Sequence, residues 1–224
     1  LKLDKEVEDL VIQHSNDDEL FEQFKELGLH GLIKQFNIEP EKNLIREGVD
    51  YRVVLSEIEL TNLIDKILLA DIVAVDTETT SLNYMEARIV GISIAIEPNQ
   101  AFYIPCMHDY DNAPKQLSRD YVLKQLKPWL EDGSTKKVGH NLKYDSHIFK
   151  NHNIDLQGVM LDTMLQSYIL NSTATRHNLN AVSKRYLNLN TVSYEEVAGK
   201  GAKEILFSQV DLKKATYYAA EDAD

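Results

Sequence analysis

The chain has 224 residues, of which 43% are hydrophobic and 27% are charged, as in an ordinary globular protein. Its net charge of −12 argues against a basic clamp for nucleic acid, and its single cysteine, Cys106, excludes an internal disulfide and a cysteine-based zinc site. No apolar run approaches the ~20 residues that span a bilayer, so we expect a cytoplasmic protein without a membrane partner. Because the sequence begins at Leu1 rather than Met, we interpret it as a piece of a longer protein.

Residues 1–50 differ in character from the remainder of the chain. An amphipathic pattern predicts a helix that begins near Asn16 and ends at Gly28. Its apolar positions recur at helical spacing: Leu20, Phe21, Phe24 and Leu27. The polar stretch 37–48 predicts a linker, and we place a boundary near residue 50.

From residue 51 onward, strands dominate first and helices later. Residues 51–55 predict a strand, and Ser56 with Glu59 matches a capping box at the start of a helix. The face of that helix is formed by Leu60, Leu63, Ile64, Ile67 and Leu68. Further strands are expected at 71–76, 88–96, 101–105, 136–140 and near 159, and helices at 118–132, 141–153, 162–171 and 211–224. This order predicts an α/β or α+β fold, with a sheet flanked by helices and a small helical N-terminal extension.

Two carboxylates follow the most apolar of these strands. Asp76 and Glu78 are two positions apart, so their side chains point to the same face of a strand. They repel each other unless a cation lies between them, and the carboxyl end of a strand is where α/β sheets bind ligands. A solvated turn is the alternative for this pair taken alone.

Three further residues extend this pattern. Asp145, within GHNLKYDSHIF, lies near the inward face of its predicted helix. Tyr218 and Asp222 share one face of the last helix through their i, i+4 spacing, whereas we expect Glu221 and Asp224 to be solvated. Each of these signals is weak by itself.

Taken together, the Asp-x-Glu pair, the later Asp and the Tyr-x-x-x-Asp pair resemble the DEDD family of 3′–5′ exonucleases, in the subclass with a tyrosine. LDTMLQSYILN (161–171), RHNLNAVSKRYL, YEEVAGKG and YYAAEDAD also resemble the proofreading domain of bacterial DNA polymerase I. The resemblance covers Tyr51 to Asp224. Residues 1 to about 40 resemble the tail of the preceding 5′ nuclease domain. Together these resemblances imply an exonuclease domain at 51–224, built on a ribonuclease H-like mixed sheet. They also imply that residues 1–50 are a 5′ nuclease tail plus linker, and that this chain contains no polymerase domain.

The resemblance also implies a two-metal site with Mg²⁺, for which Mn²⁺ or Zn²⁺ could substitute. Asp76 would bridge both ions, and Glu78 and Asp222 would help to hold the ion that binds the attacking water. Asp145 would hold the second ion through water. Tyr218 would orient the attacking water, since a tyrosine is a poor general base at neutral pH. We assign no histidine as a ligand.

The same resemblance implicates four residues in holding the single-stranded 3′ end of DNA. Leu82 would wedge near the terminal base, and Tyr194, where the family often has Phe, would stack on a base. Asn141 and Arg176 would contact the phosphate backbone. Ordinary packing is the alternative for Leu82 and Tyr194, and an ordinary surface position is the alternative for Arg176.

We therefore expect a metal-dependent exonuclease that removes mispaired 3′ nucleotides in DNA replication and repair. Its partners would be the polymerase and 5′ nuclease domains of one parent chain, in a monomeric, nucleoid-associated protein of the bacterial cytoplasm. The alternatives are a structured-RNA exonuclease like ribonuclease D and a non-catalytic module that binds single strands or supports the polymerase. We also expect the last helix to fray just beyond Asp222, which would weaken the activity of this chain.

Overall fold

The computed structural model describes residues 17–29, 31–32, 48–174 and 176–224. The chain divides into two units, Leu1–Asn43 and Leu44–Asp224, which are treated separately. In the first unit, α1 spans Asp17–Glu26 and Gly28 has a φ of +69°, so the helix predicted here and its stop are confirmed. Glycine suits that position because it has no Cβ to clash in the left-handed region. Apart from Gly48, the predicted linker at 37–48 lies outside the described residues.

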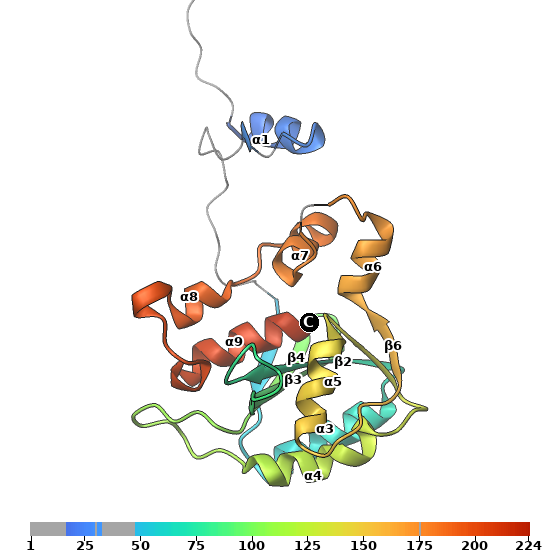
Figure 1. Cartoon of the computed structure of the whole chain (residues 1–224), viewed down its shortest axis with the longest axis vertical. Coiled ribbons are helices and arrows are strands. Elements are labelled where there is room, and N and C mark those ends of the chain that lie inside the picture. Colours follow the sequence, from blue (N-terminus) through green and yellow to red (C-terminus); the bar gives the residue numbers. More distant parts are fainter. Residues whose placement is uncertain (1–16, 30, 33–47, 175) are drawn as a thin grey trace, which may run out of the picture. The chain divides into compact units, whose positions relative to one another are not determined.

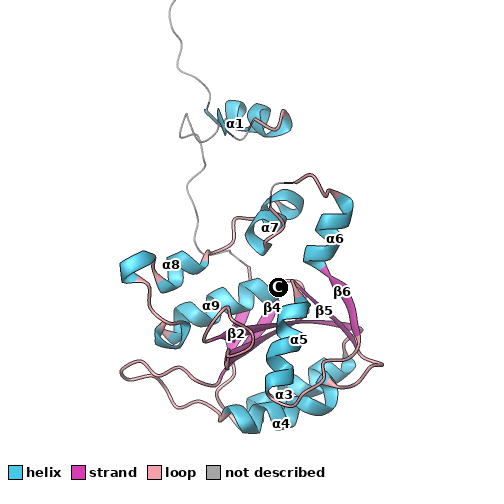
Figure 2. Ribbon diagram, viewed as in Figure 1, coloured by secondary structure: helices cyan, strands magenta, loops and turns pink. Residues whose placement is uncertain are grey.

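The second unit is built on a six-stranded mixed sheet with helices on both faces (Figures 1 and 2). The strand order is β1-β4-β3-β2-β5-β6. The central pairs β2–β3 and β3–β4 are antiparallel, and β1–β4, β2–β5 and β5–β6 are parallel. The strands are β1 (Asp50–Val53), β2 (Ile72–Thr79), β3 (Ile89–Glu97), β4 (Gln100–Pro105), β5 (Lys136–Gly139) and β6 (Val159–Asp162). The predicted α/β class and mixed sheet are confirmed.

Three helices cover one face of the sheet, where the largest apolar cluster lies. They are α3 (Glu57–Leu69), α4 (Arg119–Leu130) and α5 (Leu142–Asn151). The predicted capping box begins α3: Ser56 Oγ accepts from the Glu59 amide at 3.3 Å, and Glu59 Oε2 accepts from the Ser56 amide at 2.9 Å. Leu68 was wrongly assigned to the buried face of α3. It is exposed, because the inward stripe follows positions 60, 63 and 67, and residue 68 turns away from the sheet.

The opposite face is covered by α9 (Leu212–Ala223), which crosses four of the strands. The remaining helices are α6 (Thr163–Leu170), α7 (Leu179–Leu187) and α8 (Tyr194–Ala198), with short 3₁₀ turns at Gly201–Lys203 and Phe207–Gln209. None of the helices described is both long enough and apolar enough to cross a membrane.

Alanines bring α9 close to the sheet. Ala215, Ala219 and Ala223 recur every four residues and are buried, together with Ala220. Ala95 and Ala101 of the sheet pack in the same cluster as the end of α9. Small side chains on both surfaces let the helix approach the strands closely. As a result, the polar residues between these alanines reach the end of β2.

The end of α9 carries two carboxylates that accept hydrogen bonds, and the expectation that Glu221 is solvated was wrong. Glu221 is buried and accepts a hydrogen bond from the amide of Val192 at 2.6 Å. Asp224 accepts from the Tyr51 hydroxyl at 2.7 Å and from the Asn99 amide at 2.6 Å. Asp224 is exposed, as expected, although it accepts these two hydrogen bonds. The expected fraying beyond Asp222 stays a prediction.

Replacing Glu221 with Ala should destabilise the protein by ~1–3 kcal/mol, because the amide of Val192 would lose its buried acceptor. The melting temperature would then fall by roughly 2–4 °C for each kcal/mol. Glu221→Gln keeps an oxygen acceptor at the same position and should cost less. Thermal unfolding of the two variants measures the difference; equal stability of Glu221→Ala and the wild type would contradict the anchoring role.

Candidate active site

The site begins at the carboxyl end of β2, where Asp76 and Glu78 lie. The pairing of β2 with β3 shifts register after Glu78, which lies opposite Gly91. A Cβ on Gly91 would come within 2.2 Å of the Tyr103 hydroxyl, so only glycine lets this ring lie across β3. Burial and the charge of Glu78 raise the pKa of Tyr103, which indicates that the ring lies close to that carboxylate.

Asp145 enters from α5 and is 1% exposed. Thr77, between the two carboxylates of β2, donates from Oγ1 to Asp145 Oδ1 at 2.5 Å. This contact fixes α5 against β2 at the point where the carboxylates meet. Thr77 had no role in the sequence analysis, since its partner is 68 residues away.

Asp162 fixes the start of α5 and the start of α6 together. Its carboxylate accepts from the backbone amides of Asn141 at 3.1 Å and Leu142 at 2.9 Å. The same side chain caps α6 through the amides of Met164 at 3.0 Å and Leu165 at 3.2 Å. Capping of this kind stabilises a helix start by satisfying amides that have no helical partner. The helix that carries Asp145 is therefore positioned at its first turn.

Asp222 completes a group of four carboxylates from β2, α5 and α9. Burial raises the pKa of Asp76 to about 6. Burial also raises the pKa of Glu78 well above its usual value, and the charges of the other three carboxylates add to this rise. The pKa values of Asp145 and Asp222 are raised by burial first and by Asp76 next. Because the charge of Asp76 acts on each of the other three, the four acidic groups share one electrostatic environment.

Tyr218 lies one turn before Asp222 on α9 and faces the same group. Burial, followed by the charges of Asp222 and Glu78, raises the pKa of its hydroxyl far above the usual value. The Tyr218 ring packs edge-on against Tyr194, with centroids 6.4 Å apart, and both rings contact Phe207. The predicted base-stacking residue Tyr194 thus lies beside the acidic group.

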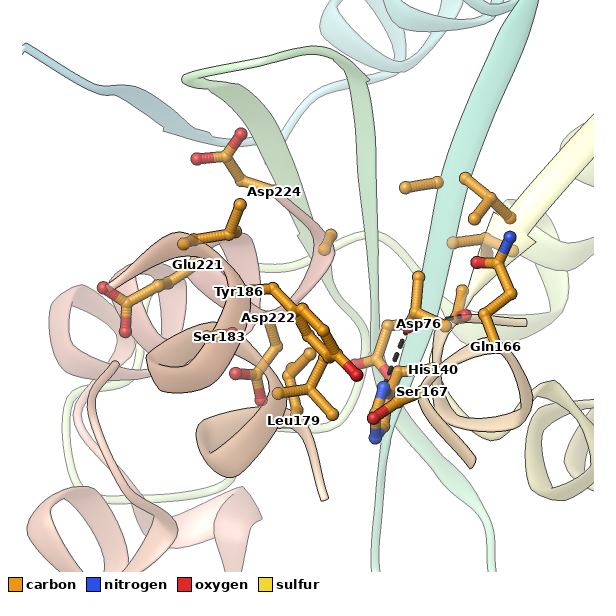
Figure 3. A pocket seen from close by; sticks show the side chains of 18 of the residues that line it. Asp76, His140, Gln166, Ser167, Leu179, Ser183, Tyr186, Glu221, Asp222 and Asp224 are labelled. Atoms are coloured by element: carbon orange, nitrogen blue, oxygen red, sulfur yellow. Dashed lines mark hydrogen bonds between the residues drawn. The ribbon is translucent and has the colours of Figure 1, made fainter. Parts of the chain in front are cut away.

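A pocket of about 430 Å³ adjoins the carboxylates (Figure 3). Asp76 and Asp222 line it, together with residues of β5, α6 and α7. His140, to which the sequence analysis gave no role, also lines the pocket, and its Nδ1 lies 2.8 Å from Thr163 Oγ1. Burial lowers the pKa of His140, so the ring is neutral at physiological pH and offers hydrogen bonds rather than charge.

The donor set fits hard divalent cations, which prefer carboxylate oxygen. None of the ion pairs found among the described residues involves Asp76, Glu78, Asp145 or Asp222, so no protein cation offsets their charge. As the side chains stand, no group of three His, Cys, Asp or Glu residues in the described part of the chain is arranged to hold an ion. Mutual repulsion is expected to keep ionised carboxylates apart until a cation draws them together.

The four predicted nucleic-acid residues are not all brought to this site. Leu82 is 93% exposed on the loop that follows β2, only four residues after Glu78. Asn141 precedes α5 with a φ of +66°, and its side chain makes no capping hydrogen bond. Arg176 is exposed between α6 and α7, and its backbone oxygen accepts from Arg185 at 3.1 Å. No interaction described here connects Arg176 to the carboxylates.

Thr77→Val should weaken metal-dependent activity by ~10–100-fold, because Asp145 would lose the hydroxyl that orients it. The change preserves the shape of the side chain, and Thr77→Ser keeps the donor and should retain most of the activity. Initial rates measured across a Mn²⁺ titration separate a loss of ion affinity from a loss of turnover. A wild-type titration curve for Thr77→Val would mean that this contact does not position Asp145.

Comparison with known proteins gives one family. A protein-family model described as 3′–5′ exonuclease matches residues 51–224. The chain is 44% identical over 209 residues to DNA polymerase I of Pseudomonas aeruginosa, covering 92% of this chain and 22% of that protein. It is 39% identical over 170 residues to DNA polymerase I of Rhizobium leguminosarum, covering 68% of this chain and 17% of that protein. The chain thus spans about a fifth of the length of these curated relatives.

Solved structures share the fold at lower identity. RNase D of Escherichia coli, an exoribonuclease involved in structured RNA processing, superposes with a TM-score of 0.57 at 16% identity, over 78% of this chain and 42% of that chain. NrnC of Brucella melitensis with bound Mg²⁺ gives a TM-score of 0.52 at 22% identity, over 78% of this chain and 74% of that chain. Both share the fold of this chain, which confirms the expected sheet flanked by helices. With the match across residues 51–224, the chain belongs to the 3′–5′ exonuclease family and is a relative of the bacterial DNA polymerases I.

Proposed function

We propose that this chain is a metal-dependent exonuclease that removes nucleotides from the 3′ end of single-stranded or mispaired DNA. The observation that carries the proposal is the group of four carboxylates from three elements, in which the charge of Asp76 raises the pKa values of the other three beside Tyr218. Glu78 and Asp145 are buried, and Asp76 and Asp222 are half-buried beside them. Gathering four acidic groups in this way is costly unless they serve a cation. A purely structural copy of the domain would have no reason to keep them.

Asp76 is central in this arrangement because its charge acts on each of the other three carboxylates. We assign Asp76 as the shared ligand, Glu78 and Asp222 as ligands on the α9 side and Asp145 as the ligand on the α5 side. Mg²⁺ or Mn²⁺, when bound, would neutralise charge on the phosphate and lower the pKa of the attacking water. Tyr218 keeps its proton at neutral pH and can donate a hydrogen bond that orients this water.

The 3′ end of the single-stranded DNA would be held largely through its bases. Tyr194 offers a ring next to Tyr218, and Leu82 offers an apolar tip on the loop after Glu78. Asn141 is four residues before Asp145, at the start of α5, where its side chain could reach a phosphate. Arg176 is the weakest member of this proposed set, because no described contact ties it to the site.

We further propose that residues 51–224 act as the proofreading unit of a longer polymerase, with residues 1–50 as the end of a 5′ nuclease domain and its linker. The matched segments make up only 22% and 17% of the relatives named DNA polymerase I, which supports this view. The net charge of −12 supports it too, because a partner domain would add the basic surface that this chain lacks.

Digestion of a 5′-labelled single-stranded oligonucleotide tests the function directly. With Mg²⁺ or Mn²⁺ we expect a ladder of products that shorten from the 3′ end, release of nucleoside monophosphates, and no reaction in EDTA. Faster digestion of a matched RNA strand would favour a structured-RNA exonuclease like ribonuclease D. Binding of the single strand without digestion under any metal would favour a non-catalytic module.

A further inference from the structure

The loop at 80–88, which connects β2 to β3, carries exposed apolar side chains next to the site. Leu82 is 93% exposed, Met85 is 72% exposed and Tyr84 is 41% exposed. Single exposed apolar residues are ordinary, but three within four positions form a patch of the kind that marks a binding surface. The loop starts two residues after Glu78, so this patch follows the β2 carboxylates closely along the chain.

Three side chains on one face of α5 contact the 80–88 loop. Tyr144, His147 and Asn151 are spaced at i, i+3 and i+7, which places them on one face of the helix. The Tyr144 hydroxyl donates to the backbone oxygen of Ser81 at 2.7 Å. The His147 ring stacks on the Tyr84 ring, with centroids 4.5 Å apart and planes at 24°.

Asn151 closes the far end of the loop. Its Nδ2 donates to the backbone oxygen of Tyr84 at 2.6 Å and lies 3.5 Å from that of Ala87. Within the loop, the Thr80 amide donates to the oxygen of Arg88 at 3.0 Å. The helix that positions Asp145 therefore also fixes the loop, and the apolar tips stand in a preset position relative to the carboxylates.

A preset apolar surface suits the neutral part of nucleic acid. In a chain with a net charge of −12, phosphates are repelled at long range, whereas bases carry no charge. Contacts with bases contribute affinity without reading sequence. A surface that is already ordered also binds without the cost of fixing a loop.

We propose that Met85 acts with Leu82 as a two-residue apolar wedge against the bases at the 3′ end, and that His147 and Asn151 are positioning residues for this wedge. This inference rests on the proposed exonuclease function. Leu82 would contact the terminal base and Met85 the bases that precede it. Asn151, which lies at the other end of α5 from the carboxylates, would act only through the loop.

Met85→Ala tests the wedge with two substrates. One is a short single-stranded DNA, and the other is the p-nitrophenyl ester of thymidine monophosphate, which has no preceding base. The ratio of the rate on DNA to the rate on the ester should fall about tenfold, as expected when a base contact is lost. Leu69→Ala, at an apolar position on α3 that is 89% exposed, should leave the ratio unchanged.

Asn151→Ala tests the positioning role. It should lower the same ratio, and Met85→Ala should then add little in the Asn151→Ala background, because the wedge is already misplaced. Amides of residues 80–87 should exchange hydrogen faster in this variant. An unchanged ratio for Met85→Ala, or fully independent effects of the two substitutions, would overturn the inference.

Failure of the proposed function would look different, since the wild type would then digest neither substrate. Binding of a fluorescent single-stranded DNA in Ca²⁺, followed by anisotropy, still tests the wedge in that case. Weaker binding by Met85→Ala than by Leu69→Ala would support it, and equal binding by the two variants would contradict it.

Discussion

Asp145→Asn should lower metal-dependent digestion of single-stranded DNA by at least ~100-fold. Asp145 is 1% exposed, so a carboxylate ion from solution cannot reach its position and replace it as a ligand. An asparagine amide is a much poorer ligand for Mg²⁺ than a carboxylate. The substitution keeps the size of the side chain and leaves an oxygen that can accept from Thr77. Initial rates on a 5′-labelled strand in Mg²⁺ and Mn²⁺ measure the effect.

The control for this variant is Asp65→Asn, which removes one negative charge from an exposed position on α3. It should digest DNA at the wild-type rate. Thermal unfolding should show that Asp145→Asn is folded, so that lost activity reports on the site. Digestion by Asp145→Asn at the wild-type rate would remove Asp145 from the metal site.

Glu78→Gln should stabilise the metal-free protein while abolishing its activity. Burial and the three neighbouring carboxylates raise the pKa of Glu78, so its ionised form is unfavourable in the folded chain. Removing the charge should raise the melting temperature by roughly 2–4 °C for each kcal/mol of repulsion relieved. Mg²⁺ or Mn²⁺ should stabilise the wild type and have a much smaller effect on Glu78→Gln.

The pH dependence has a definite sign. The folded pKa of Asp76 is about 6, and those of Glu78, Asp145 and Asp222 are also raised, whereas unfolded carboxyl groups titrate near ~4. The folded chain binds more protons, so the contribution of these groups to stability is full below about pH 4 and is lost as the pH rises through 6 and above.

Melting temperatures in EDTA at about pH 5.5 and about pH 8 measure this loss. The fall between the two should be smaller in Glu78→Gln than in Asp65→Asn, which controls for net charge alone. An equal fall in the two variants would mean that the carboxylates do not repel one another in the folded chain.

Local sequence patterns were sufficient to predict much of the fold and the central residues of the site. The capping box at Ser56 and Glu59 depends on residues three positions apart, so it was readable directly. The sheet followed from short apolar runs separated by turns. Asp76 and Glu78 were identified because two carboxylates at the end of an apolar strand need an explanation. Asp145, Tyr218 and Asp222 became convincing only through their combined order along the chain.

What the sequence could not reveal depends on contacts between distant segments. Thr77 meets Asp145 across 68 residues, and Glu221 meets the amide of Val192 across 29 residues. Nothing near Glu221 distinguishes it from a solvated acid, because its acceptor role exists only after α9 has docked. The error at Leu68 has a related cause, since an apolar residue at the edge of a helical stripe can turn to either side.

The most direct test of the metal site is diffraction from crystals soaked with Mn²⁺ and a nucleoside monophosphate. We expect two anomalous peaks beside Asp76, about 3.5–4 Å apart, with Glu78 and Asp222 next to one and Asp145 next to the other. The Tyr218 hydroxyl should face the phosphate. Absence of ordered Mn²⁺ at Asp76, or binding of the ion elsewhere while these four carboxylates stay apart, would contradict the account.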